Sequence, residues 1–93
     1  MLQAIILMEV ERGCLDRVAQ ALLAIAGVRE VYSTAGSYDM VVLLRVESPD
    51  RLNEVVNAEM ARVPHIVRTH TLTAFRCYDR GDLDRMFSVG LDP

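Results

Sequence analysis

The sequence predicts a single α+β domain whose strands and helices follow the order βαββαβ. Four short runs have the apolar and β-branched composition of strands, and two longer segments repeat apolar residues at helical spacing. A length of 93 residues fits one domain. This order is the split βαβ, or ferredoxin-like, arrangement, in which two helices cover one face of a four-stranded antiparallel sheet.

The first half of the chain predicts a strand, a helix and a second strand. Residues 2–10 read LQAIILMEV, a short apolar run whose length suits a strand buried on both faces. Over residues 14–26 apolar side chains return at every third or fourth position, which is typical of an amphipathic helix. Gly27 suits the left-handed residue that ends a helix, and residues 28–35 are polar enough for an edge strand.

The second half repeats the pattern with clearer signals. Residues 39–47 are an apolar strand, and Ser48 followed by Pro49 gives the N-cap and first position of a helix that stops at Pro64. Residues 65–78 form a long strand rich in threonine. Because the first and third strands are the apolar ones, we expect them in the centre of the sheet.

Both central strands carry apolar residues at alternate positions of either parity. Helices cover only one sheet face, so the other face would expose more aliphatic surface than a monomer normally does. We therefore expect two sheets to pack face to face in a two-fold dimer, the alternative being that the tail folds over the face. We assign the domain to residues 1–78 and expect the tail, 79–93, to be partly disordered or docked on a neighbouring chain.

Composition excludes several function classes. The net charge is −3 and every basic residue is arginine, which argues against direct nucleic-acid binding and leaves no lysine for Schiff-base chemistry. No apolar run approaches the ~18 residues of a membrane span, and no signal peptide is apparent. We expect a cytoplasmic protein that does not bind membranes.

No catalytic or metal-binding motif stands out along the chain. Cys14 and Cys77 are far apart without a CxxC pair, which is neither a disulfide framework nor a zinc pattern, so reduced thiols are expected. His65 and His70 do not have the spacing of ligands that converge on one metal. There is no nucleophile elbow and no glycine-rich phosphate loop. The sequence predicts no enzyme, no cofactor and no metal.

The stretch Gly36-Ser37-Tyr38-Asp39 is the most informative short motif. As geometry it is a hairpin turn, with glycine supplying a positive φ. Asp39, however, directly precedes an apolar strand, where a carboxylate is costly unless it is paired. Backbone N–H groups of a glycine turn hold carboxylates, so such a turn and an acid together complement the two charges of an amino acid.

Thr69, Thr71 and Thr73 share one face of the last strand. Threonine suits exposed strands, so this pattern alone is explained by β-propensity. Three hydroxyl groups in a row also suit a polar pocket at an interface.

The stretch GVREVYSTAGSYDMVVLLRV, a helix that begins Ser-Pro-Asp and a Thr-x-Thr strand resemble the effector (RAM) domain of the Lrp/AsnC transcriptional regulators over roughly residues 2–78. The resemblance implies a free amino acid bound at contacts between dimers, and it implies rings built from several dimers. Ser37 stands where the family often has an acid, which bears on ligand preference. The ligand-binding residues implied by the resemblance are Gly36, Ser37, Tyr38, Asp39, Thr69 and Thr71.

Full regulators of this family carry an N-terminal helix-turn-helix domain, whereas here the first strand begins at Leu2. We therefore expect a stand-alone, non-catalytic effector module that senses an amino acid and modulates a full-length regulator. The alternatives are a small dimeric monooxygenase-like enzyme, an ACT-like domain whose ligand loop would be ERGCLD with Gly13, and a purely structural oligomerisation module.

Overall fold

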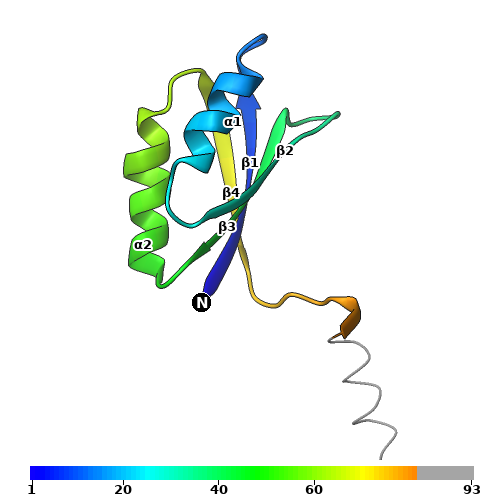
Figure 1. The fold of residues 1–93 in the computed structure, drawn as a ribbon, viewed down its shortest axis with the longest axis vertical. Coiled ribbons are helices and arrows are strands. Elements are labelled where there is room, and N and C mark those ends of the chain that lie inside the picture. Colours follow the sequence, from blue (N-terminus) through cyan, green and yellow to red (C-terminus); the bar gives the residue numbers. More distant parts are fainter. Residues whose placement is uncertain (82–93) are drawn as a thin grey trace, which may run out of the picture.

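A computed structural model of the chain describes residues 1–81. The order βαββαβ is confirmed, with the second helix continued by two irregular turns (Figure 1). The elements are β1 (Leu2–Val10), α1 (Leu15–Leu23), β2 (Val28–Ser33), β3 (Met40–Val46), α2 (Pro49–Glu54), η1 (Val55–Glu59), η2 (Met60–Arg62) and β4 (Ile66–Ala74).

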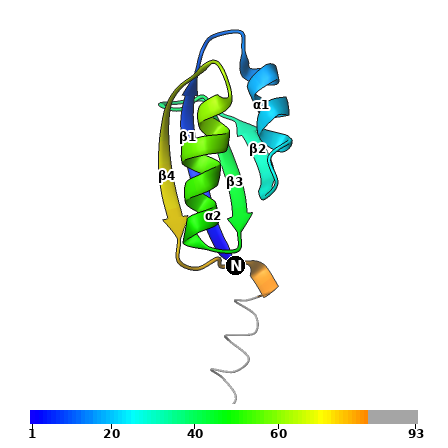
Figure 2. The same cartoon turned by 90° about the vertical axis from the view of Figure 1, so that its left-hand side faces the viewer.

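The four strands form one antiparallel sheet in the order β2-β3-β1-β4. The two apolar strands therefore occupy the centre, as the sequence predicts. Both helices lie on one face of the sheet, and neither α1 nor α2 lies on the other face (Figures 1 and 2). The ferredoxin-like arrangement is thereby confirmed.

The core lies between the sheet and the two helices. In β1 and β3 every second residue is buried and its neighbours are only half-buried or exposed, which is the strand period of two. Ile6, Met8 and Val42 are fully buried, and Val18 and Leu22 of α1 belong to the same cluster from the helix side. The remaining buried residues are Ala4, Val10, Met40, Leu44, Val46, Val55 and Met60.

Several elements are shorter than their sequence patterns predict. The helix expected over residues 14–26 ends at Leu23, and two tight turns lead into β2: Ile25 N donates to Leu22 O and Val28 N to Ile25 O. The last strand ends at Ala74 rather than at residue 78 because Ala74 already pairs with Gln3 near the start of β1. Beyond that point β4 has no strand to pair with.

The second helix begins as expected but does not stay regular. Ser48 Oγ accepts a hydrogen bond from Arg51 N at 3.2 Å, and Pro49 occupies the first turn. From Val55 the helix widens into a π turn, closed by the bond from Met60 N to Val55 O. Residues five apart lie on different sides of an α-helix, with 3.6 residues per turn, whereas here Val55 and Met60 both reach the core.

Arg51 holds this irregular helix in place. Its guanidinium donates to Glu54 and Glu59 along the helix and to Ala26 O, 3.1 Å away, in the turn between α1 and β2. The hydrogen bond to Glu59 raises the pKa of Arg51 above its ordinary value. The arginine therefore stays charged and links the two helices.

The predicted tail, residues 79–93, falls largely outside the described residues, so its docking or disorder stays a prediction. No helix within residues 1–81 is long and apolar enough to cross a membrane.

Candidate functional site

The predicted turn is an ordered hairpin between β2 and β3. Thr34 N donates to Asp39 O at 2.9 Å, and Thr34 Oγ1 donates to Tyr38 O at 2.7 Å. Gly36 has φ +124°, a backbone conformation that favours glycine, and a Cβ built there would meet nothing within 4 Å. Glycine is therefore required by the backbone, while the space beside it stays open. We call residues 34–39 the hairpin turn.

Asp39 has a partner that the sequence did not reveal. Its backbone N donates to Met8 O at 2.9 Å, and its Oδ2 accepts from Val10 N at 2.8 Å. Strand pairing between β1 and β3 ends at Met8 and Met40, so the carboxylate replaces the next ladder bond. This hydrogen bond explains why an acidic residue directly precedes an apolar strand. Within residues 1–81 the second oxygen, Oδ1, makes no hydrogen bond or ion pair.

This geometry makes the stability of Asp39 variants a test of its structural role. Asp39→Ala removes the acceptor of Val10 N and is expected to lower the free energy of unfolding by about 1–3 kcal/mol. Asp39→Asn keeps an oxygen at that place, so its free energy of unfolding should fall clearly less than that of Asp39→Ala. Chemical denaturation of the two variants beside the parent chain measures both, and equal losses would contradict the assigned hydrogen bond.

Thr69 and Thr71 lie on the other side of β1 from the hairpin turn. Thr69 pairs with Met8 and Thr71 with Ile6, so both threonines share the sheet face that carries the core. Both are exposed, because they lie on the edge strand. Met8 also pairs with Met40 of β3 on its other side. Thr69 therefore lies two strand spacings, about 10 Å, from Met40, the residue that follows Asp39.

Thr69 also lines a pocket of about 300 Å³ between the second helix and the edge of β4, together with Asn57 and Met60. None of the residues of the hairpin turn lines this pocket. The two groups implied by the resemblance therefore lie at the same end of the sheet, but β1 separates them. Within one chain the hairpin turn and the two threonines are therefore not brought together.

The helix-free sheet face presents two rows of side chains across the four strands. Each row runs across the sheet from β4 through β1 and β3 to β2. The first row consists of Leu72, Ile5, Leu43 and Glu30. The second row consists of His70, Leu7, Val41 and Tyr32. Glu9 and Arg68, 3.4 Å apart, border the rows on one side. We call this surface the open face; its apolar residues are Ile5, Leu7, Val41, Leu43, Tyr32 and Leu72.

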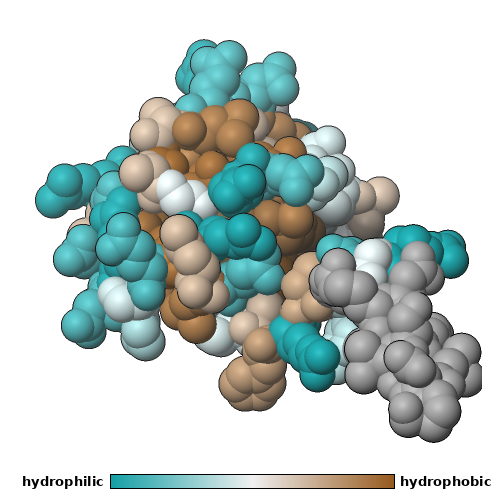
Figure 3. All heavy atoms as spheres, turned by 60° about the horizontal axis from the view of Figure 1, so that its bottom comes forward, coloured by the Kyte–Doolittle hydropathy of each residue, from teal (hydrophilic) through white to brown (hydrophobic). Residues whose placement is uncertain are grey.

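The open face has an apolar centre and a polar border, which is the usual anatomy of a protein interface. Its four central aliphatic side chains are only half-buried in the single chain. Figure 3, a view obliquely from below that of Figure 1, shows apolar side chains exposed between polar ones on that side of the molecule. At the border the hydroxyl of Tyr32 donates to Glu30 Oε2 at 2.6 Å, and this hydrogen bond raises the pKa of Tyr32. Tyr32 therefore remains neutral at physiological pH.

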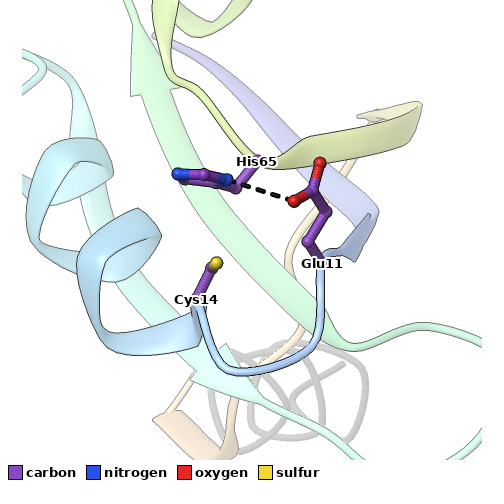
Figure 4. A group of neighbouring side chains, drawn as sticks. All are labelled: Glu11, Cys14 and His65. Carbon is purple, nitrogen blue, oxygen red and sulfur yellow. Dashed lines mark hydrogen bonds and ion pairs between the residues drawn. The ribbon is translucent and has the colours of Figure 1, made fainter.

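A further group of side chains escaped the sequence-based prediction. Glu11, Cys14 and His65 converge from the β1–α1 loop and the loop before β4 (Figure 4). Their donor atoms are carboxylate oxygen, thiol sulfur and imidazole nitrogen, a set that can hold a metal ion. No local spacing pattern marks the three residues, because His65 lies far along the chain from Glu11 and Cys14.

The four-stranded sheet and the two helices on one of its faces place the chain in the class of small α+β domains with the ferredoxin-like arrangement. The chain belongs to the Lrp/AsnC ligand binding domain family, whose family model matches residues 3–83. This confirms the resemblance and favours it over the ACT-like and monooxygenase-like alternatives.

Proteins that are similar to this chain in sequence include transcriptional regulators. The HTH-type transcriptional regulator FL11 of Pyrococcus abyssi is 33% identical over 75 residues, which are 81% of this chain and 49% of that protein. The chain thus spans about half the length of the curated relatives it matches. Among solved structures, TTHA0845 from Thermus thermophilus has 34% identity and a TM-score of 0.79, over 86% of this chain and 100% of that one.

A more distant structure was solved with an amino acid. The transcriptional regulator NMB0573 of Neisseria meningitidis, in complex with L-Met, has a TM-score of 0.77 and 11% identity, over 85% of this chain and 53% of that one. At this identity the likeness shows the shared fold alone.

Proposed function

We propose that this chain is a non-catalytic effector module that binds a free amino acid at contacts between dimers. The observation that carries the proposal is the separation of the hairpin turn from Thr69 and Thr71 by β1. We call the hairpin turn one half-site and Thr69 with Thr71 the other. Because the half-sites lie at one end of the sheet but cannot close over a ligand within one chain, a complete site needs a second chain. Ligand binding and assembly are then coupled.

The hairpin turn supplies groups for both charges of an amino acid. Backbone N–H groups around Gly36 and Ser37 receive the α-carboxylate, and Asp39 Oδ1 receives the α-ammonium while Oδ2 stays on Val10 N. Tyr38, half-buried beside them, forms the wall of this half-site. Thr69 and Thr71 from a neighbouring dimer supply hydroxyl groups. The L-Met complex of the Neisseria regulator supports an amino-acid ligand for this fold.

The dimer forms through the open face. Two copies that pack their sheets together cover the aliphatic rows of β1 and β3, which otherwise remain in water. The hairpin turn and Thr69 lie at one end of the sheet, so they stay accessible in such a dimer and meet further dimers in a ring.

The effector shifts assembly only through a difference in its affinity for the assembled and separated forms. The partners are further copies of this chain and a full-length Lrp/AsnC-type regulator in the cytoplasm. Such a regulator would supply DNA recognition, since the acidic balance of this chain does not suit nucleic acid.

A thermal-shift screen of the full chain against the twenty amino acids tests this function. A ligand at a hundredfold excess over its Kd stabilises the folded state by about 2.7 kcal/mol, which is readily measured. Asp39→Asn is expected to abolish the shift, because it keeps an acceptor for Val10 N but loses the charge that pairs with the ammonium group.

Glu47→Gln is the matched control, because it removes an exposed carboxylate just beyond the opposite end of β3. It should leave the shift unchanged. A full response in Asp39→Asn, or no response of the parent chain to any amino acid, would contradict the proposed site and favour a purely structural oligomerisation module.

A further inference from the structure

A compact set of mixed donor atoms lies where β1 leads into α1 and where the chain enters β4. One ligand atom from each of Glu11, Cys14 and His65 lies within 4.8 Å of the other two (Figure 4). We propose that these three side chains bind a divalent transition-metal ion of the zinc class. This site is separate from the hairpin turn and from the open face, and it does not depend on an amino-acid ligand.

The distances fit an ion with little rearrangement. Bond lengths of about 2.0–2.3 Å to zinc place the donors of a tetrahedral shell about 3.3–3.7 Å apart. His65 Nδ1 and Glu11 Oε2 are already 3.2 Å apart and share one proton in a hydrogen bond. An ion that replaces this proton keeps both groups where they are. The sulfur of Cys14 then has to approach by about 1 Å at most.

Backbone hydrogen bonds hold the three residues together independently of their side chains. Glu11 N donates to His65 O at 2.9 Å, and Cys14 N donates to Glu11 O at 3.1 Å. Gly13, with φ +83°, makes the tight turn that aims Cys14 toward the same space. The donor set is therefore built on a fixed frame at the ends of β1 and β4, as a binding site requires.

The backbone conformation of His65 fixes the position of its imidazole. His65 has φ +76°, and it is the one non-glycine residue of the described chain with a positive φ. The left-handed conformation is unfavourable for most side-chain-bearing residues by about 1–2 kcal/mol, although histidine and asparagine adopt it more often than most. Strained residues gather at functional sites, and here the strain places an imidazole beside a carboxylate and a thiol.

The donor types select the ion. Thiolate and imidazole favour zinc and its neighbours over magnesium or calcium, which take oxygen donors. Three protein ligands leave a fourth position for water or for a group from another molecule. The side chain of His65 is 33% exposed and that of Glu11 59%, so an ion reaches the site from solvent. Among residues 1–81 the sulfur of Cys14 has one hydrogen-bond partner, Arg12 O, at the long distance of 3.9 Å.

Titration of the full, untagged and reduced chain with Co²⁺ as a spectroscopic probe tests the site. We expect one ion per chain, a thiolate-to-cobalt charge-transfer band, and loss of that band when Zn²⁺ is added. Cys14→Ser and His65→Asn should each weaken binding by at least about 100-fold, since even outer-shell changes weaken metal sites 10–100-fold. Asparagine tolerates a positive φ, so His65→Asn removes the ligand and keeps the turn.

The chain supplies matched controls, since it has only two cysteines and two histidines. Cys77→Ser and His70→Asn change the other two, and both should bind Co²⁺ like the parent chain. Absence of the thiolate band in the parent chain, or its persistence in Cys14→Ser, would overturn the proposal.

Alkylation of the unmodified sequence gives a second readout that does not depend on how the variants fold. With Zn²⁺ present, mass spectrometry should show Cys14 reacting at least about ten times more slowly with iodoacetamide, with no change at Cys77. Equal rates at Cys14 with and without Zn²⁺ would also overturn the proposal.

Discussion

Leu43→Glu is expected to abolish self-association and leave a folded monomer. Leu43 lies at the centre of the open face, beside Ile5 of β1 and Glu30 of β2. A carboxylate there would be buried between two sheets without a partner, at a cost of about 3–5 kcal/mol for each copy. Fold stability should change little, because the side chain is half-buried in the single chain and faces away from the helices. Size-exclusion chromatography with light scattering measures the mass, and circular dichroism checks the fold.

Leu23→Glu is the matched control for this change. Leu23 is a leucine whose side chain is 54% exposed, more than that of Leu43, and it belongs to α1 on the opposite side of the sheet. It should keep the mass of the parent chain. If Leu43→Glu keeps that mass, or if Leu23→Glu loses it equally, the open face is not the dimer interface.

Gly27→Ala is expected to lower the free energy of unfolding by about 3 kcal/mol, a large part of the 5–15 kcal/mol typical of a domain. Gly27 has φ +104°, and an added Cβ would lie 3.0 Å from Arg45 O and 3.1 Å from Val46 Cγ1. The backbone cannot withdraw easily, since Gly27 O accepts a hydrogen bond from Arg45 N at 2.8 Å. Urea denaturation of the variant and the parent chain measures the loss.

Gly13→Ala separates backbone strain from the steric clash. Gly13 also has a positive φ, +83°, but a Cβ there would meet nothing within 4 Å. Gly13→Ala should therefore lower the free energy of unfolding by the cost of backbone strain alone, about 1 kcal/mol. Equal losses in the two variants would mean that close packing of Gly27 against β3 does not limit this position.

The fold follows from local patterns, which is why it could be predicted. The apolar run of residues 2–10 matches β1 at both ends, and the Ser48-Pro49 start of the second helix is confirmed by its cap. Strong periodicity and capping chemistry act over a few residues, so the sequence displays them directly. The central position of β1 and β3 follows as well, because those two strands are apolar along most of their length, whereas β2 and β4 are more polar.

The details that the sequence hid all depend on contacts between distant segments. β4 ends at Ala74 because its partner strand ends, and the π turn at Val55–Glu59 serves packing on the sheet. The bond from Val10 N to Asp39 crosses 29 positions, and the pair Glu11–His65 crosses 54. Neither pair has a local pattern, so the structural role of Asp39 and the proximity of Glu11, Cys14 and His65 emerge only in three dimensions.

Native mass spectrometry of the full, untagged chain tests the central claim most directly, since one spectrum reports both the number of chains and the number of bound ligands. We predict assemblies with an even number of chains that retain the stabilising amino acid and grow from dimers to larger rings when it is present. A monomer that stays monomeric at every concentration and retains no amino acid would contradict an effector module whose site is completed between dimers.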